Sequence, residues 1–287
     1  MAAPEQRLTL QSTVEIPHSR GTILRPRIGF GVYQSPPDIC KKSCLEALRC
    51  GYRAIDTAQF YENEKEVGEA VRESGILRSE VFITTKLLLP EGSVEKTLER
   101  CWRSVREIGL GYVDLFLIHT PSSGPEGRRE MWLALENLLE EGGTRAIGVS
   151  NYGVKHLEEM KSYATFPPVA NQIECHVLCQ QRPIVEYCRK NAIQVEAYCP
   201  LVRGTLMKNP TILGIAARHS TATPSQILIR WCLQHGFIPL PKSDNPQRIR
   251  ENAGAYSFEL DASDMKLLDS MDLGVDGALV PQNTDCP

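Results

Sequence analysis

The sequence predicts an α/β fold in which eight βα units close into a (β/α)8 TIM barrel, with an N-terminal β-hairpin cap and a C-terminal helix and tail near the barrel mouth. Short β-rich runs alternate with amphipathic helical stretches along the chain, which indicates parallel strands. The length of 287 residues suits one such barrel, which takes about 250 residues before insertions. No shift in composition and no long linker divides the chain. We therefore expect residues 1–287 to form a single domain.

The elements can be assigned in order. Residues 1–24 alternate weakly between apolar and polar side chains, which predicts a hairpin that closes the bottom of the barrel. We expect strands at 27–33, 52–56, 81–86, 113–119, 144–149, 169–173, 194–198 and 237–240. We expect helices at 39–50, 64–74, 94–108, 129–141, 155–163, 181–191, as a pair across 211–235, and at 246–253. Helical periodicity is clearest at 94–108, where apolar residues recur three or four positions apart. The last segments predict a helix over 263–271 and a tail over 274–287 that could cross the barrel mouth.

The composition is that of an ordinary soluble protein. Hydrophobic residues make up 42%, charged residues 23%, and the formal net charge is -3, so we expect neither nucleic acid nor an anionic membrane as a partner. The ten cysteines include no Cys-x-x-Cys pair, which favours reduced, mostly buried thiols. The group of Cys175, His176 and Cys179 lacks the second half of a zinc site, so no metal is expected. Without a signal-peptide core or a stretch of about 18 apolar residues, we expect a cytoplasmic protein.

An acidic residue ends the predicted second strand. Asp56 closes an apolar run, and Tyr61 follows in a short loop before a charged helix. A carboxylate at the end of a buried strand needs a cation or water, because its desolvation is costly. From this stretch alone, a catalytic Asp56 and an Asp56 that caps the next helix are equally good interpretations.

Polar side chains terminate almost every predicted strand. Because all strands of a parallel barrel end at one rim, these residues should converge there. They are Asp56, Tyr61, Lys86, His119, Ser150, Asn151, Gln172, Tyr198, Lys242 and Ser243. Each has a structural explanation by itself, such as a lysine that reaches water or an asparagine that caps a helix. Their coincidence on one rim favours a functional site.

Four of these residues form a chemically coherent set. A tyrosine with an ordinary pKa near 10 is a poor proton donor at neutral pH unless a cation stabilises its phenolate. Lys86 can supply that charge to Tyr61, and Asp56 can balance Lys86. His119 then offers an N–H that positions a carbonyl oxygen and stabilises the negative charge developing on it.

These and other segments resemble the aldo-keto reductase family. The matching pieces follow the family's order over nearly the whole chain, so the resemblance is highly specific. They are GYRAIDTA (51–58) with Glu64, Val67 and Gly68, TTK (84–86), LIH (117–119), GVSN (148–151), NQIECH (171–176), and LPKS (240–243) with Arg248, Glu251 and Asn252.

The resemblance implies a catalytic tetrad and a nicotinamide cofactor. Asp56, Tyr61, Lys86 and His119 match the tetrad, with Tyr61 as general acid and hydride passing from NADPH to a carbonyl carbon. The resemblance further implies that Tyr198 stacks on the nicotinamide. The residues that it implies for the carboxamide are Ser150, Asn151 and Gln172, and further cofactor contacts are implied at Gly31, Val32, Asp56 and Leu201.

The segment after the last strand predicts a site for the other end of the cofactor. Pro246 lies near the first position of a helix whose free N–H groups could bind an anion. Lys242 and Arg248 add charge suited to a 2′-phosphate, which favours NADPH over NADH. Ser243, Glu251 and Asn252 match adenosine-side residues of the family. The alternative is an ordinary capped surface helix.

The glycines of the first strand do not make a dinucleotide fingerprint. Position 34, where such a motif needs a further glycine, is Gln34. We interpret Gly29 and Gly31 as small residues of a close-packed strand that let the cofactor approach.

Several substrate-side positions depart from the family's pattern. Thr120 and Tyr33 stand where tryptophan is common, Val177 and Leu178 replace Pro-Tyr, and Cys199 replaces serine. We expect a substrate pocket made by Tyr33, Phe60, Tyr61, His119 and Thr120. The small Thr120 should leave room for a bulky or branched substrate unless Phe60, Trp132 or the C-terminal tail fills it.

The sequence thus predicts an NADPH-dependent carbonyl reductase of the alcohol dehydrogenase type, with a small-molecule carbonyl substrate. We expect a monomer and leave a dimer open. One alternative is a cofactor-bound regulatory or scaffolding protein with slow turnover, against which the intact tetrad argues. A hydrolase with paired carboxylates would need a second acid on the rim. A metal-dependent barrel is disfavoured because Lys86 would oppose a divalent cation.

Overall fold

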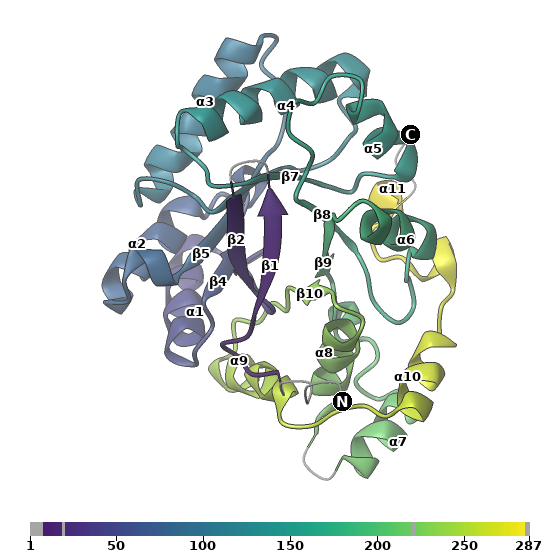
Figure 1. Ribbon diagram of the computed structural model, residues 1–287. Coiled ribbons are helices and arrows are strands. Elements are labelled where there is room, and N and C mark those ends of the chain that lie inside the picture. Colours follow the sequence, from purple (N-terminus) through teal and green to yellow (C-terminus); the bar gives the residue numbers. More distant parts are fainter. Residues whose placement is uncertain (1–7, 19–20, 220–221, 285–287) are drawn as a thin grey trace, which may run out of the picture.

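Eight short parallel strands form the centre of the computed structural model, which describes residues 8–18, 21–219 and 222–284. Each strand pairs with the next one along the chain, from β3 to β10 (Figure 1). The strands are β3 (Phe30–Gly31), β4 (Ala54–Asp56), β5 (Phe82–Leu87), β6 (Leu115–Ile118), β7 (Ile147–Ser150), β8 (Ala170–Glu174), β9 (Gln194–Tyr198) and β10 (Ile238–Pro239). The expected eight strands are confirmed, although β3, β4, β6, β7 and β10 are shorter than the sequence predicts.

Backbone hydrogen bonds join the first and last strands. The N–H of Gly29 donates to the carbonyl of Pro239 at 3.0 Å, and that of Gly31 donates to Pro241 at 3.1 Å. The two prolines have no N–H to return, so these bonds run in one direction. A Cβ atom on Gly29 would lie 2.5 Å from Leu240 Cδ2, so Gly29 is small because the barrel closes there. This confirms the close packing that the sequence predicts for Gly29.

Helices surround the sheet and follow the predicted order. The α-helices are α1 (Pro37–Arg49), α2 (Glu64–Ser74), α3 (Val94–Ile108), α4 (Gly124–Glu140), α5 (Val154–Met160), α6 (Arg182–Lys190), α7 (Pro210–Arg218), α8 (Pro224–Gln234), α9 (Pro246–Ala253), α10 (Ala262–Asp269) and α11 (Pro281–Thr284). Short 3-10 turns are η1 (Gln59–Tyr61), η2 (Arg78–Glu80), η3 (Val202–Gly204), η4 (Gly254–Tyr256) and η5 (Gly274–Gly277). α4 begins five residues earlier than predicted, because Gly124 and Pro125 already belong to its first turn.

The N-terminal hairpin closes the bottom of the barrel, as the sequence predicts. β1 (Thr13–His18) pairs antiparallel with β2 (Gly21–Pro26), and Figure 1 shows both strands in front of the central sheet. Ile16 and Ile23 are 2% exposed and pack against residues at the N-terminal ends of the barrel strands, among them Ala54 and Phe82. β2 also carries a fully buried charged side chain, Arg25, into the barrel.

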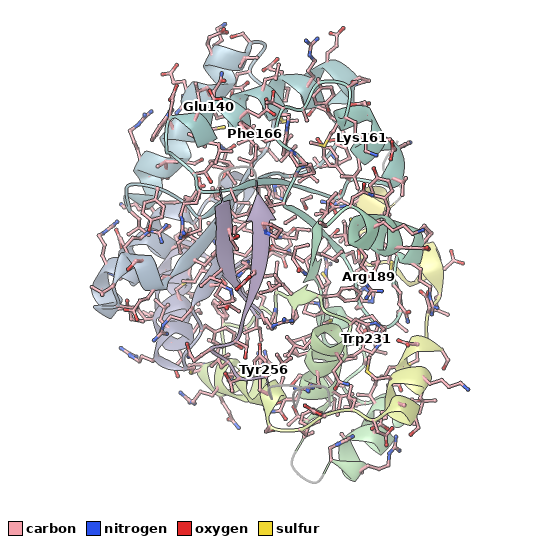
Figure 2. The ribbon with its side chains drawn as sticks, viewed as in Figure 1. Glu140, Lys161, Phe166, Arg189, Trp231 and Tyr256 are labelled. Atoms are coloured by element: carbon pink, nitrogen blue, oxygen red, sulfur yellow. The ribbon has the colours of Figure 1, made fainter. Side chains whose placement is uncertain are left out.

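A second, larger core lies between the sheet and the helices. Polar contacts also join some of the helices around this core to one another. In α8, the buried Trp231 (Figure 2) donates its indole N–H to Asp269 in α10 at 2.8 Å. No helix in the described parts of the chain is both long and apolar enough to cross a membrane.

The C-terminal segment reaches the carboxyl ends of the strands. The expected helix appears as α10, and η5 and α11 follow it. The carboxylate of Glu174, at the end of β8, accepts the backbone N–H of Leu279 at 2.6 Å and of Val280 at 2.9 Å. The predicted tail therefore lies against the barrel mouth as far as residue 284, and its last three residues are outside the described ranges.

A buried carboxyl group joins α2 to β5 directly beneath the barrel rim. Glu64, the first residue of α2, is 5% exposed. Its Oε1 accepts a hydrogen bond from the Thr85 hydroxyl at 2.5 Å. Burial raises the pKa of Glu64 to about 7, although hydrogen bonds from Thr85 and Ser104 oppose this effect. The folded protein therefore holds a proton on Glu64 that the unfolded chain releases near pH 4.5.

We predict that Glu64→Gln is more stable than the wild type at neutral and alkaline pH. Because the folded-state pKa of Glu64 is raised, the wild type should lose stability as the pH rises from about 4.5 to about 7. Glu64→Gln should match the wild type at pH 4 and exceed it at pH 8 by about 3 kcal/mol in free energy of unfolding. Urea unfolding at both pH values measures this, with the exposed Glu62→Gln as control. Equal stability of the wild type and Glu64→Gln at pH 8 would contradict it.

Candidate active site

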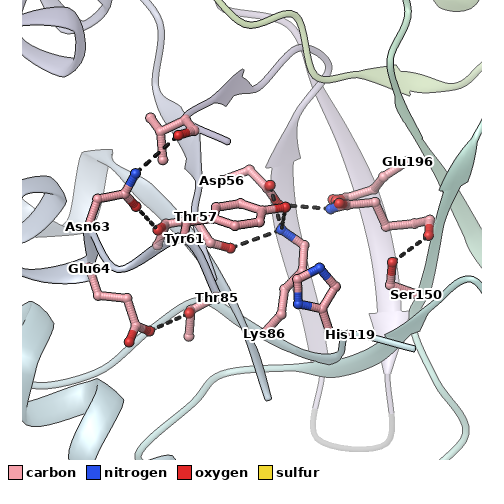
Figure 3. Close-up of polar contacts among 12 residues, drawn as sticks. Asp56, Thr57, Tyr61, Asn63, Glu64, Thr85, Lys86, His119, Ser150 and Glu196 are labelled. Atoms are coloured by element: carbon pink, nitrogen blue, oxygen red, sulfur yellow. Dashed lines mark hydrogen bonds and ion pairs between the residues drawn. The ribbon is translucent and has the colours of Figure 1, made fainter. Parts of the chain in front are cut away.

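Three of the four predicted catalytic side chains meet around one ammonium group. Lys86 Nζ lies 2.6 Å from Asp56 Oδ1 and 3.3 Å from the Tyr61 hydroxyl oxygen, and it also donates to the carbonyl of Thr57 at 2.9 Å (Figure 3). The Lys86 side chain is 1% exposed. Asp56 ends β4, Lys86 lies one residue before the end of β5, and Tyr61 ends η1. The barrel thus brings together residues that are up to 30 positions apart.

Asp56 is the counter-ion of Lys86. It does not cap α2, whose preceding residue is Asn63, so the capping interpretation is excluded. Burial raises the pKa of Asp56, and the Lys86 ammonium and hydrogen bonds oppose that effect. A buried ammonium without such a partner would be very costly. The pair therefore makes a cation possible at this depth.

Tyr61 is held as a protonated phenol in the resting site. Burial, followed by the negative charge of Asp56, raises the pKa of the Tyr61 hydroxyl well above its usual range. We expected Lys86 to lower this pKa. The structure differs because Asp56 lies nearer to the ammonium than Tyr61 does and already balances its charge. Lys86 can therefore help Tyr61 only when the phenol gives up its proton.

His119 lies beside Tyr61 and is neutral. Their ring centroids are 5.7 Å apart, and Figure 3 shows the imidazole next to Lys86. Burial, and then the charge of Lys86, lowers the pKa of His119 to about 3. Its Nδ1 is buried and has no hydrogen-bond partner among the described residues. A neutral imidazole has one N–H to donate, which suits the positioning of a carbonyl oxygen.

A buried asparagine fixes the loop that carries Tyr61. Asn63 Oδ1 accepts the hydroxyl of Thr57 at 2.7 Å. Its Nδ2 donates to the carbonyls of Val32 at 3.0 Å and Ser35 at 3.1 Å. These contacts tie the segments after β3 and β4 together. Sequence reasoning missed this role, because a lone asparagine before a helix usually indicates only a cap.

The residues expected around a nicotinamide carboxamide meet only in part. Asn151 Oδ1 accepts the hydroxyl of Tyr198 at 2.8 Å, and its Nδ2 donates to the backbone carbonyl of His119 at 2.9 Å. Ser150 Oγ donates to the backbone carbonyl of Gln172 at 2.7 Å. The Gln172 side chain turns the other way, and its Nε2 donates to Asp56 Oδ2 at 2.8 Å. Ser150 and Asn151 therefore lie together as expected, and Gln172 joins them only through its backbone. Tyr198, whose ring is expected to stack on the nicotinamide, contacts this group through its hydroxyl.

The segment after β10 differs from the expected anion site. Asn245 Oδ1 accepts the backbone N–H groups of Gln247 at 2.9 Å and Arg248 at 3.1 Å, so the start of α9 is capped and those N–H groups are not free. Lys242 Nζ is paired with Asp244 at 2.5 Å. This corrects the expectation of free N–H groups, and the charge of Lys242 is shared with Asp244.

Other residues near this end remain available to a cofactor. Arg248 is exposed, forms no ion pair among the described residues, and donates from Nε to Ser243 Oγ at 3.4 Å. Glu251 Oε1 accepts the Ser225 hydroxyl at 3.0 Å, and Asn252 is buried beside it in α9. Three further residues expected to contact a cofactor lie at the end of β3 and in the loop between β9 and η3. Gly31 and Val32 are buried, and Leu201 is half-buried.

An open aromatic rim lies in front of the tetrad. Tyr33 and Phe60 are 40% and 54% exposed. The Tyr33 ring centroid is 5.0 Å from that of Tyr61, and the Phe60 centroid is 6.0 Å from that of His119. Trp132 is buried in α4 and donates to Glu136 at 3.1 Å, whereas Thr120, just after β6, is half-buried.

Comparison with known proteins gives consistent matches over most of the chain. The sequence model of the Aldo/keto reductase family matches residues 27–273. Glyoxal reductase of Bacillus subtilis is 39% identical over 264 residues, which are 92% of this chain and 94% of the relative. The 9,11-endoperoxide prostaglandin H2 reductase of Trypanosoma cruzi is 40% identical over 254 residues, which are 87% and 89% of the two chains.

A solved structure also shares the fold. The aldo-keto reductase of Bombyx mori in complex with NADP aligns with a TM-score of 0.83 and 29% identity, over 91% of this chain and 93% of that one. Together with the barrel and its rim, the family match and these relatives show that the chain belongs to the aldo/keto reductase family of oxidoreductases.

Proposed function

We propose that the protein is an NADPH-dependent reductase that converts an aldehyde or ketone to an alcohol, with Tyr61 as general acid. The observation that carries this proposal is the buried Lys86 ammonium, held between Asp56 and the Tyr61 hydroxyl next to a neutral His119. A protonated phenol supported by a cation can give up a proton to an oxygen that becomes negative.

The chain's own groups can be assigned to the steps of the reaction. A bound nicotinamide cofactor supplies the hydride, which goes to the carbonyl carbon. The His119 N–H holds the carbonyl oxygen. As negative charge develops on that oxygen, the Tyr61 O–H bond breaks and the proton forms the alcohol O–H. Lys86 stabilises the phenolate that remains, and Asp56 balances the charge of Lys86.

The described residues fit a nicotinamide cofactor along the rim. The Asn151 amide and the Tyr198 hydroxyl lie together beside the backbone of His119, and a bound carboxamide would exchange hydrogen bonds with this pair. Arg248 offers a guanidinium without an acidic partner among the described residues, a good ligand for a phosphate. We therefore assign the 2′-phosphate to Arg248 first and to Lys242 second, since Lys242 must share its charge with Asp244.

We further propose a bulky or branched substrate. The small Thr120 is half-buried next to His119, and Tyr33 and Phe60 on the rim are exposed. The relatives' names cover both a small dicarbonyl, glyoxal, and a large lipid endoperoxide, so the family accommodates both sizes. The small Thr120 and the exposed aromatic rim favour the larger substrate here.

Tyr61→Phe should lower the turnover number for aldehyde reduction by about 10² to 10⁴-fold, because the general acid is lost while the ring stays in place. NADPH oxidation with a panel of aldehydes and ketones measures this. Tyr112→Phe, which removes a hydroxyl far from the rim, is the control and should retain full activity. A Tyr61→Phe enzyme with wild-type turnover would show that Tyr61 is not the acid.

NADPH should bind more tightly than NADH, and Arg248→Met should weaken NADPH binding by about 10 to 100-fold with little effect on NADH. The lost interaction is a charge-assisted hydrogen bond to the 2′-phosphate. Fluorescence titration measures both dissociation constants. Arg250→Met, on the same helix but paired with Glu46, is the matched control. Near-equal affinities of the wild type for NADPH and NADH would refute the assignment.

Thr120→Trp should reduce turnover of a large cyclic ketone by at least about 10-fold and leave a small aldehyde nearly unaffected, because the indole is far bulkier than the threonine side chain. Steady-state rates with both substrates measure this, and Thr120→Ser is the control. If the wild type already strongly prefers the small aldehyde, the bulky-substrate proposal is wrong.

A further inference from the structure

A buried ion pair lies beneath the tetrad and is connected to it by hydrogen bonds. Arg25 Nε lies 2.8 Å from Glu196 Oε1, and both side chains are 0% exposed. Glu196 Oε2 accepts a hydrogen bond from Gln172 Nε2 at 2.9 Å, and the same nitrogen donates to Asp56 Oδ2 at 2.8 Å. Figure 3 shows Glu196 on the side of Asp56 opposite to Asn63 and Glu64. A continuous polar chain therefore runs from the hairpin strand β2 to the tetrad.

Burying the Arg25 guanidinium at this position costs desolvation free energy. Its guanidinium lies 4.6 Å from the centroid of the Phe82 ring, and a Cβ on Gly29 would lie 3.2 Å from its Nη2. The only acidic side chain that it pairs with among the described residues is Glu196. A fully buried arginine is rare and needs a partner. Apolar residues would close the barrel bottom equally well, as Ile16 and Ile23 do nearby.

The charged side chains along this hydrogen-bonded path form two ion pairs. Arg25 balances Glu196, and Lys86 balances Asp56. Between the pairs, the single amide nitrogen of Gln172 donates to both carboxylates, which uses both of its protons. The negative charge of Glu196 already contributes to the raised pKa of Asp56. Without Arg25, that charge would stand uncompensated one hydrogen-bonded step from Asp56, where electrostatic interactions are strong.

We propose that Arg25 and Glu196 are positioning residues for the proton transfer from Tyr61. Glu196 orients Gln172, which holds the second oxygen of Asp56, and Arg25 cancels the charge that Glu196 would otherwise direct against a Tyr61 phenolate. The inference rests on the proposed function of Tyr61 as general acid. It assigns a role in the reaction to the N-terminal hairpin, which otherwise only closes the barrel.

Other titratable groups also face this region and stay unchanged in the experiment. They are Tyr33, Cys199 and His119 around Tyr61, Glu64 near Lys86, and Glu174 near Tyr198 and Cys199.

The test compares the pH dependence of carbonyl reduction in charge-altered variants of the full chain. Arg25→Met leaves a surplus negative charge and should move the alkaline fall of the turnover number up by about one pH unit. Glu196→Gln leaves a surplus positive charge and should move it down by a similar amount. The double variant Arg25→Met/Glu196→Gln restores neutrality and should return close to the wild-type profile.

Two further variants separate this role from a purely structural one. Arg78→Met breaks the ion pair with Asp114 at 2.8 Å near the start of β5 and should lower stability without moving the pH profile. Arg25→Lys retains the charge and should keep the wild-type profile. Glu196→Gln and Arg25→Lys preserve hydrogen-bonding groups, so they decide the question even if Arg25→Met does not fold.

Opposite shifts for the two single variants support the proposal. Shifts in the same direction, or profiles identical to the wild type, would overturn it. Failure of the proposed function would instead appear as undiminished turnover in Tyr61→Phe, whatever the Arg25 and Glu196 variants do.

Discussion

The buried ion pair of Lys86 and Asp56 is the interaction on which the site depends. A lysine ammonium inside a barrel is stable only with a close counter-charge and further hydrogen bonds. Asp56 and the Thr57 carbonyl provide both, at 2.6 and 2.9 Å. Because the Asp56 carboxylate balances the charge of the Lys86 ammonium, Tyr61 stays a protonated phenol beside a cation. In the proposed reaction, Tyr61 is thus a proton donor whose product, the phenolate, is stabilised by the Lys86 ammonium already in place.

The barrel supplies this arrangement through several layers. Parallel strands bring Asp56 and Lys86 to one rim, and Asn63 fixes the loop that carries Tyr61. Below them, the hairpin fills the bottom of the barrel and contributes Arg25. The polar chain from Arg25 to the rim means that the two ends of the barrel are not independent. A change at the hairpin can alter the electrostatics of the rim without touching the substrate.

Much of the fold and the centre of the site could be predicted from the sequence. Alternating βα periodicity predicts the barrel, and the rule that parallel strands end at one rim predicts the meeting of Asp56, Lys86 and His119. The remaining features depend on side-chain direction, which periodicity does not contain. Gln172 turns toward Asp56 because a buried carboxylate oxygen there needs a donor. The pairing of Arg25 with Glu196 spans 171 residues and has no local signal.

The most direct test of this account is the rate of hydride transfer in Lys86→Met, followed by stopped-flow absorbance of NADPH in a single turnover, together with NADPH affinity by fluorescence. If Lys86 acts by stabilising the Tyr61 phenolate, the rate should fall by at least about 100-fold while the dissociation constant of NADPH stays within a few-fold of the wild type. Unchanged hydride transfer, or a loss of rate fully explained by lost NADPH binding, would contradict the central role given to the Lys86 ion pair.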